Sequence, residues 1–247
     1  MFSKRPIGGH AQPLEMREIL HAIHAAKDDY ARLPFFQFLR DESMTARDRL
    51  AFVPCMAPFI MDFGDLNRYV LRDPSSEDPH QQLVNEHTFE DDHHWPWYLE
   101  DVAALGHDRS RPTTDVLREL YSDRLAVNRL LASKLAHLVA DATPIERLVV
   151  IEAIEETGNV LFTHTAALAR RVERDEGIEL RYLGDFHLTL ESGHARTRDD
   201  GHSLAAVELD DRARARCRWL ADEVFALFAE WVAELHAYAI APVFQAA

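Results

Sequence analysis

The sequence predicts an all-α protein, a single-domain bundle of seven to eight helices. Glycine is scarce, with 9 in 247 residues, and the good helix formers Leu, Ala, Arg and Glu dominate while β-branched residues are few. Clusters of turn-forming residues are separated by segments of roughly 18 to 35 residues, which is too long for strands. We expect residues 14–247 to form this domain, after a flexible N-terminal segment of residues 1–13.

The first expected helix lies within residues 15–33, where apolar residues recur at helical spacing. They are Met16, Ile19, Leu20, Ile23 and Ala26. The next helical segment, residues 49–72, contains Pro54 and Pro58. Because proline lacks the backbone N–H and clashes with the preceding turn, we expect this helix to kink or split.

Two long helices are expected in the second half of the chain. Residues 143–171 open with Thr143, Pro144 and Glu146, which together form a capping box with proline in the first turn. The last long segment carries one apolar stripe, typical of a helix packed against a core. The stripe consists of Leu220, Val224, Leu227, Trp231 and Leu235.

The charge and cysteine content exclude several classes of protein. A formal net charge of −15 argues against nucleic acid or an anionic membrane as the partner, since either requires a basic face. No stretch resembles a signal peptide or a membrane span, so we expect a soluble, cytoplasmic protein. Cys55 and Cys217 form neither a disulfide framework nor a CxxC pair, and we interpret them as reduced core residues.

Three stretches carry candidate metal ligands. In the first, His187, Glu191 and His194 are spaced by four and then three residues, within roughly 60° of one another on a helix. Imidazole and carboxylate donors on one stripe suit iron, manganese or zinc. The competing interpretation is an ordinary polar helix end.

The second stretch, HTFEDDHHWPWYLEDV (87–102), offers two helical stripes that the sequence does not distinguish cleanly. Glu86, Glu90 and His93 make the better ligand set, because they combine carboxylates with an imidazole in an E-x-x-H arrangement. The adjacent stripe contains His87 and His94, and His94 is either a core histidine or the true ligand. The remaining acids here, Asp91 and Asp92, are expected to be outer-shell groups or to face solvent.

The third stretch is IEAIEETGNVLF, in which Glu155 interrupts an otherwise apolar stripe. A lone carboxylate there costs several kcal/mol unless it is paired or bound to a cation. A buried salt bridge to an arginine is the alternative explanation. Glu156 lies about 100° away and is the surface candidate.

Together these stretches supply six nitrogen and oxygen ligands from three helices, without cysteine. Such a set suffices for two metal ions about 3.5–4 Å apart, or for one ion with additional outer-shell groups. The predicted ligands are Glu86, His93, Glu155, His187, Glu191 and His194, with Glu90, His94 and Glu156 as alternatives.

The order E-x6-H, a central Glu, then H-x3-[DE]-x2-H, in an all-α chain of this length, resembles the heme-oxygenase-like diiron oxidases and oxygenases. The resemblance covers about residues 14–240, and its specific part is the six predicted ligands. Glu191 departs from the aspartate often found at its position. The doubled His93–His94 leaves the ligand register of the first core helix open.

The resemblance implies an enzyme that binds two iron ions and uses O₂ to oxidise a small amine, amino-acid or fatty-acid-type metabolite. An apolar wall would keep reactive oxygen species from water. The candidates for this wall are Trp95, Trp97, Tyr98 and Phe162, although aromatic residues at helical spacing are also ordinary core.

Other functions remain open at this point. The same fold hosts heme oxygenases, for which His21 or His24 would be the proximal ligand, and thiaminase-type enzymes, for whose active-site cysteine Cys55 and Cys217 look unsuited. It also hosts cofactor-free oxidases. A non-enzymatic ligand-binding protein is the last alternative, with the polar cluster as a hydrogen-bond network. Oligomeric state is weakly indicated, and a homodimer is a mild expectation.

Overall fold

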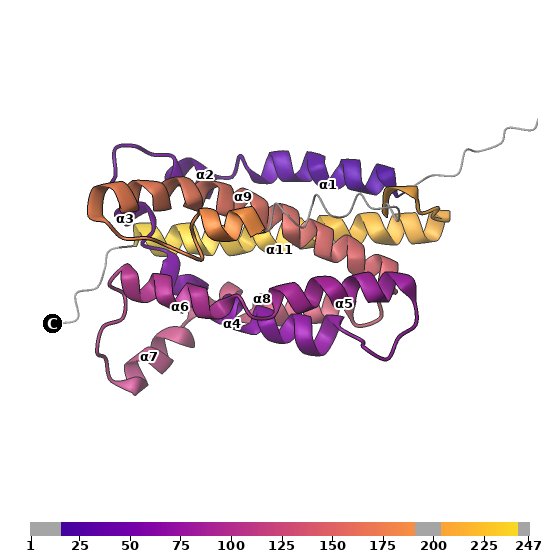
Figure 1. Ribbon diagram of the computed structural model, residues 1–247, viewed down its shortest axis with the longest axis horizontal. Coiled ribbons are helices and arrows are strands. Elements are labelled where there is room, and N and C mark those ends of the chain that lie inside the picture. Colours follow the sequence, from indigo (N-terminus) through magenta and orange to yellow (C-terminus); the bar gives the residue numbers. More distant parts are fainter. Residues whose placement is uncertain (1–15, 191–203, 242–247) are drawn as a thin grey trace, which may run out of the picture.

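The computed structural model describes residues 16–190 and 204–241, which form an all-α bundle in which no strand occurs (Figure 1). The prediction of an all-α fold is therefore confirmed. The N-terminal segment 1–13, expected to be flexible, lies outside the described residues.

The described ranges contain seven α-helices of nine or more residues. They are α1 (Arg17–Tyr30), α4 (Ala57–Asp65), α5 (Pro79–Asp91), α6 (Trp95–Ala104), α8 (Ala126–Val139), α9 (Pro144–Glu176) and α11 (Asp211–Ile240). Shorter elements connect them: α2 (Pro34–Leu39), α3 (Ala46–Arg49), α7 (Thr113–Leu120), the 3₁₀ turns η1 (Val53–Met56), η3 (Asp123–Leu125) and η4 (Leu204–Ala206), and the π-helix η2 (Leu66–Leu71). Residues 185–190 are also helical.

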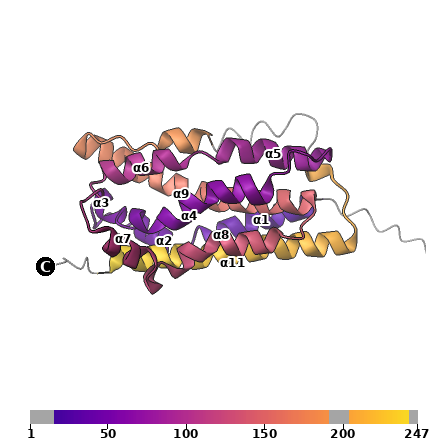
Figure 2. The same ribbon diagram turned by 90° about the horizontal axis from the view of Figure 1, so that it is seen from below.

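Helices α9 and α11 run side by side along the length of the molecule (Figures 1 and 2). Helices α1 and α2 pack against both of them, while α8 packs against α11 and α5 against α9. Helix α4 lies between α8 and α6. This arrangement buries one continuous apolar core and places α5 directly against the middle helix α9.

Helix α9 spans 33 residues, or about 50 Å at 1.5 Å per residue. It begins with the expected capping box: the Thr143 side chain accepts a hydrogen bond from the Glu146 backbone, and the Glu146 side chain accepts one from the Thr143 backbone. It ends at Gly177, whose φ of 71° is a left-handed conformation that glycine adopts without strain. A helix held at both ends is a rigid support for a side chain at its middle, where Glu155 lies.

The two prolines of residues 49–72 split the helix as predicted. Pro54 lies in the 3₁₀ turn η1, and α4 begins at Ala57 with Pro58 in its first turn. The predicted stripe of the last helix is confirmed for Leu220, Val224, Trp231 and Leu235, which are buried in α11, whereas Leu227 is half-buried.

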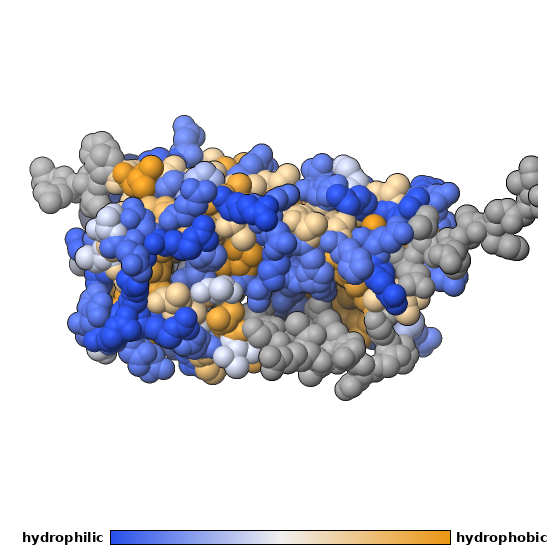
Figure 3. Space-filling view, turned by 90° about the horizontal axis from the view of Figure 1, so that it is seen from above, coloured by the Kyte–Doolittle hydropathy of each residue, from blue (hydrophilic) through white to orange (hydrophobic). Residues whose placement is uncertain are grey.

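The surface is mixed. On the face seen from above, hydrophilic side chains predominate and hydrophobic ones are scattered among them (Figure 3). None of the helices in the described ranges combines the length and the apolar character needed to cross a lipid bilayer.

Candidate metal centre

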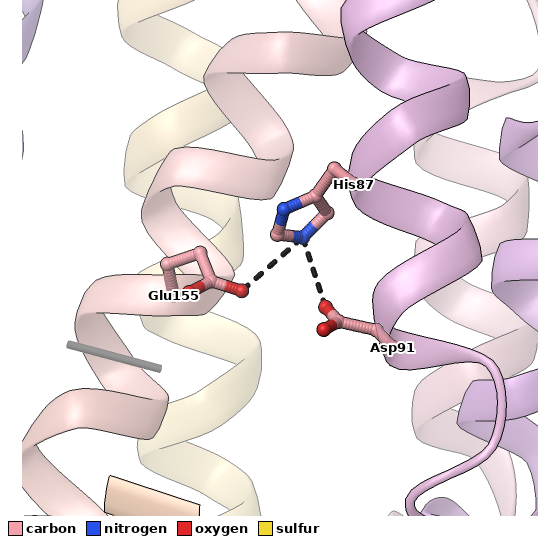
Figure 4. Close-up of side chains that lie close together, drawn as sticks. All are labelled: His87, Asp91 and Glu155. Carbon is pink, nitrogen blue, oxygen red and sulfur yellow. Dashed lines mark ion pairs between the residues drawn. The ribbon is translucent and has the colours of Figure 1, made fainter. Parts of the chain in front are cut away.

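A histidine and two carboxylates from two helices converge in the middle of the bundle (Figure 4). His87 and Asp91 lie one turn apart on α5, and Glu155 reaches them from α9. The Nε2 atom of His87 lies 2.9 Å from Oδ2 of Asp91 and 3.2 Å from Oε1 of Glu155. One donor atom from each residue lies within 4.8 Å of the others. Metal–ligand bonds of about 2.1 Å place neighbouring ligand atoms about 3 Å apart, so the three donors are spaced suitably for one ion.

The cluster is shielded from water. The side chains of His87 and Asp91 are 7% and 3% exposed, and that of Glu155 is 16% exposed. Burial alone would lower the pKa of His87, but the charge of Asp91 and hydrogen bonds to Asp91 and Glu155 raise it to about 10. Two buried carboxylates thus create a local demand for positive charge, which a proton on His87 or a metal cation would meet.

The position of α5 follows from its two ends. Asp78 caps its N-terminus by accepting hydrogen bonds from the backbone of His80 and Gln81. The helix ends at Asp91 because Pro96 follows: proline has no N–H to donate to the carbonyl four residues earlier, that of Asp92, and its ring clashes there.

Arg72 fixes the C-terminal end of α5. Its guanidinium donates to the Thr88 carbonyl and hydroxyl and to Oδ2 of Asp92 at 2.7 Å, and it lies over the ring of Phe89. Burial would raise the pKa of Asp92, but hydrogen bonds from Arg72 and His93 hold it below its usual value. Asp92 therefore forms an ion pair with Arg72 and is not a candidate metal ligand.

Helix α4 approaches the same break closely. A Cβ atom on Gly64 would lie 2.9 Å from the carbonyl oxygen of Asp92, closer than real Cβ contacts. Only glycine therefore lets α4 reach this point without moving the backbone. Gly64 and Arg72 together fix where α5 stops and which of its residues face inward.

Two further buried histidines, His94 and His187, contact each other. Nε2 of His187 lies 3.1 Å from Nδ1 of His94, and Nδ1 of His187 lies 2.9 Å from the Tyr182 carbonyl, to which it donates. That bond assigns the proton of His187 to Nδ1, so Nε2 presents its lone pair. His94 stacks on Trp97, with ring centroids 4.6 Å apart.

Asp101 on α6 holds the loop that precedes His187. Its two carboxylate oxygens accept hydrogen bonds from the backbone N–H groups of Arg181, at 2.7 Å, and Leu183, at 2.8 Å. Burial raises the pKa of Asp101 to about 6, although these backbone hydrogen bonds oppose the rise. Because the Tyr182 carbonyl lies between the two anchored residues, Asp101 indirectly orients His187.

A cavity of about 70 Å³ adjoins these polar groups. Asp91, His94, Glu155 and His187 form the polar part of its wall. The rest is apolar apart from the Tyr182 hydroxyl: Phe59, Ile60, Phe63, Gly64, Trp95, Ile154, Gly158, Leu161, Phe162, Tyr182, Phe228 and Trp231. The carboxylate and imidazole groups thus border a space with mainly aromatic and aliphatic walls.

The structure corrects the register expected for the first core helix. Glu86 and Glu90 are exposed, as is His93, which lies beside Asp92, whereas His87 and Asp91 face Glu155. Glu86 and Glu90 lie on the exposed face of α5, and His93 lies beyond the end of this helix. Asp91, expected to be an outer-shell or solvent-facing residue, is part of the cluster.

A sequence signal for the inward register exists. His87, Asp91 and His94 have the spacing H-x3-D-x2-H, which matches the H-x3-E-x2-H spacing of residues 187–194. The same pattern occurring twice, with the acid in the same place, is a signal that favours this register over the E-x-x-H alternative, which helix periodicity alone does not.

The other predicted residues are distributed as follows. Glu155 faces the cluster and His187 the cavity, whereas Glu156 pairs with Lys27 and His24 of α1 on another side of α9. Glu191 and His194 lie outside the described residues.

Of the expected cavity wall, Phe162 and Trp95 line the cavity. Trp97 instead stacks on His94, and the hydroxyl of the buried Tyr98 donates to the Val53 carbonyl, so neither is among the lining residues. The heme alternative finds no support in His21 or His24, which are both exposed.

Fold and site together define an all-α protein with a candidate metal centre of carboxylate and imidazole ligands beside an apolar cavity. No protein-family model matches the chain, and no curated protein matches it either.

Proposed function

We propose that this protein is an iron-dependent enzyme that uses O₂ to oxidise a small amine, amino-acid or fatty-acid-type metabolite. The observation that carries the proposal is the buried convergence of His87, Asp91 and Glu155 at the polar side of an otherwise apolar cavity. The fold resemblance of the sequence supports iron as the metal.

The donor set fits iron. Histidine with carboxylates and no thiolate is the ligand chemistry of non-heme iron, and the site offers two carboxylates and one imidazole within reach of one ion. A second iron would take ligands from the H-x3-E-x2-H stretch. Of the three candidate ligands in this stretch, the structure describes only His187. Bound ferrous iron would supply the electrons that reduce O₂.

The protein's own residues have separate tasks in this proposal. Asp91 and Glu155 neutralise the charge of the cation, and His87 gives up its proton when it binds the metal. Phe59, Phe63 and Trp231 exclude water from the cavity. The substrate is held by the apolar wall rather than by ion pairs.

One alternative has an observation in its favour. His87 forms ion pairs with both carboxylates, so the same cluster would also serve as a hydrogen-bond network in a ligand-binding protein that holds no metal. The two proposals differ in metal content and in the response to chelation.

The test is an anaerobic titration of chelator-treated protein with Fe(II), with metal counting, followed by O₂ exposure in a stopped-flow spectrometer. The proposal expects stoichiometric iron that is lost in His87→Ala and retained in Glu86→Ala, a neighbouring residue that is exposed. It also expects an absorbance change with O₂ that requires bound iron. Absence of stoichiometric iron in the wild type would support the metal-free protein instead, and equal iron binding in both variants would contradict the assignment of His87 as a ligand.

A further inference from the structure

Gly158 is a helix-interior glycine whose presence the packing of the backbone does not explain. It lies in the middle of α9, one turn after Glu155. Glycine at such a position destabilises a helix by about 1 kcal/mol relative to alanine. The positive-φ glycines of the described residues are Gly106 and Gly177, so Gly158 does not need its conformational freedom.

A side chain at Gly158 would not meet the backbone. An added Cβ would contact the ring of Phe162 at 3.7 and 3.9 Å, which is ordinary van der Waals distance, and, apart from the adjacent backbone of its own helix, no other described atom within 4 Å. Two other glycines behave differently. At Gly64 and Gly184 the Cβ would lie 2.9 Å and 2.0 Å from the carbonyl oxygens of Asp92 and Leu180.

The space that Gly158 leaves open is the cavity. Gly158 lines it together with Ile154, Glu155 and Phe162 of the same helix, and aromatic residues of α4 and α11 form the facing wall. A larger side chain at this position would therefore occupy cavity volume beside Glu155.

We infer that Gly158 determines which ligands the cavity accepts, by keeping space beside Glu155 open for an apolar group. The inference rests on the proposed function in one respect, namely that the ligand is a substrate. The lining is apolar away from Asp91, His94, Glu155 and His187, so the group that enters on that side is aliphatic or a small gas molecule. The volume of about 70 Å³ is less than half the ~150 Å³ of a cavity that binds benzene, which excludes an aromatic ring.

Xenon is a suitable probe because it binds apolar cavities without any metal. The experiment measures xenon binding by ¹²⁹Xe NMR and by crystals under xenon pressure, for wild type, Gly158→Ala and Gly158→Val. Ala167→Val is the matched control, since Ala167 lies on the same helix but is exposed. Thermal unfolding and Fe(II) binding are measured for all four proteins.

The expected result is a xenon site in the cavity of the wild type that weakens in Gly158→Ala, is lost in Gly158→Val and persists in Ala167→Val. Gly158→Ala should also raise the Tm, since alanine favours the helix. If Gly158→Val does not fold, Gly158→Ala decides the question.

Xenon binding that is equal in the wild type and in a folded Gly158 variant would overturn the inference, as would absence of xenon from the wild-type cavity. Failure of the proposed function has a different signature: the xenon results hold, but no variant and no wild-type protein binds Fe(II).

Discussion

Oε1 of Glu155 lies 3.2 Å from Nε2 of His87, although the two residues belong to different helices and are far apart in the sequence. This contact joins the middle of α9 to the last turns of α5 (Figure 4). An unpaired carboxylate in the apolar stripe of α9 would be costly. The contact with His87 instead makes Glu155 part of a cluster whose negative charge favours a bound cation.

Replacing Glu155 by alanine should weaken Fe(II) binding by more than about 100-fold, because loss of a ligand costs more than the ~10–100-fold loss for an outer-shell partner. The control is Glu156→Ala, which removes the adjacent carboxylate that pairs with Lys27 and His24. Anaerobic titration monitored by metal analysis measures both. Equal affinities for the two variants would contradict the assignment of Glu155.

The doubled histidine provides a test of the register. His94 is buried against His187 and Trp97, whereas the side chain of His93 is 60% exposed. We expect His94→Ala to lower Fe(II) affinity at least about tenfold, whether His94 binds the metal or orients His187. His93→Ala should leave the Fe(II) affinity unchanged. A larger loss of affinity in His93→Ala than in His94→Ala would support Glu86 and His93 as the ligands instead.

Arg72 should contribute substantially to stability because it joins η2 to the end of α5. Its side chain is 8% exposed and bonds to Thr88 and Asp92. Arg72→Met leaves a largely buried carboxylate without its main partner, and we expect a loss of about 2–4 kcal/mol in the free energy of unfolding.

Arg68→Met is the comparison for Arg72, since Arg68 approaches the same carboxylate at 3.5 Å but its side chain is 47% exposed. Its loss should cost much less than the loss of Arg72, because an exposed ion pair is screened by solvent. Urea unfolding of chelator-treated protein gives both values. Similar losses in the two variants would show that Arg72 does not hold the end of α5.

Asp101 should give an unusual pH dependence. Burial raises its pKa in the folded state to about 6, above the ordinary value of 3.8. Between these values the unfolded chain binds fewer protons than the folded one, so this residue makes the protein less stable as the pH rises from about 4 to 6. The effect amounts to at most about 3 kcal/mol.

The measurement is the difference in unfolding free energy between wild type and Asp101→Asn at pH 4.5 and 6.5. At both pH values the variant lacks one of the two side-chain oxygens that accept hydrogen bonds from backbone N–H groups. Only the change with pH of the difference in unfolding free energy therefore reports on the ionisation. It should shift in favour of the variant at the higher pH. Asp108→Asn, at an exposed position, should show no such shift.

Much of the fold could be predicted because its signals are local. The capping box of Thr143 and Glu146, the splitting of a helix by Pro54 and Pro58, and the buried stripe of α11 all depend on residues within a few turns of one another. The inward orientation of Glu155 was predictable for the same reason, since its neighbours on the helix face are apolar.

The register of α5 was not predictable by the same reasoning. Both stripes of the segment carry histidines and acids, and helix periodicity alone favours neither. The effect of Pro96, which ends the helix before His93, was readable in the sequence. The close approach of Gly64 and the bonds of Arg72, which fix the end of α5, come from other elements.

The sequence by itself determined which segments are helical and which residues have the chemistry of metal ligands, because propensity, capping and periodicity act within one helix. Only the tertiary structure decided that His87 and Asp91, rather than Glu86 and His93, meet Glu155. The physical reason is that the convergence depends on how α4, α5 and α9 pack, and packing sums contacts between residues that are distant along the chain.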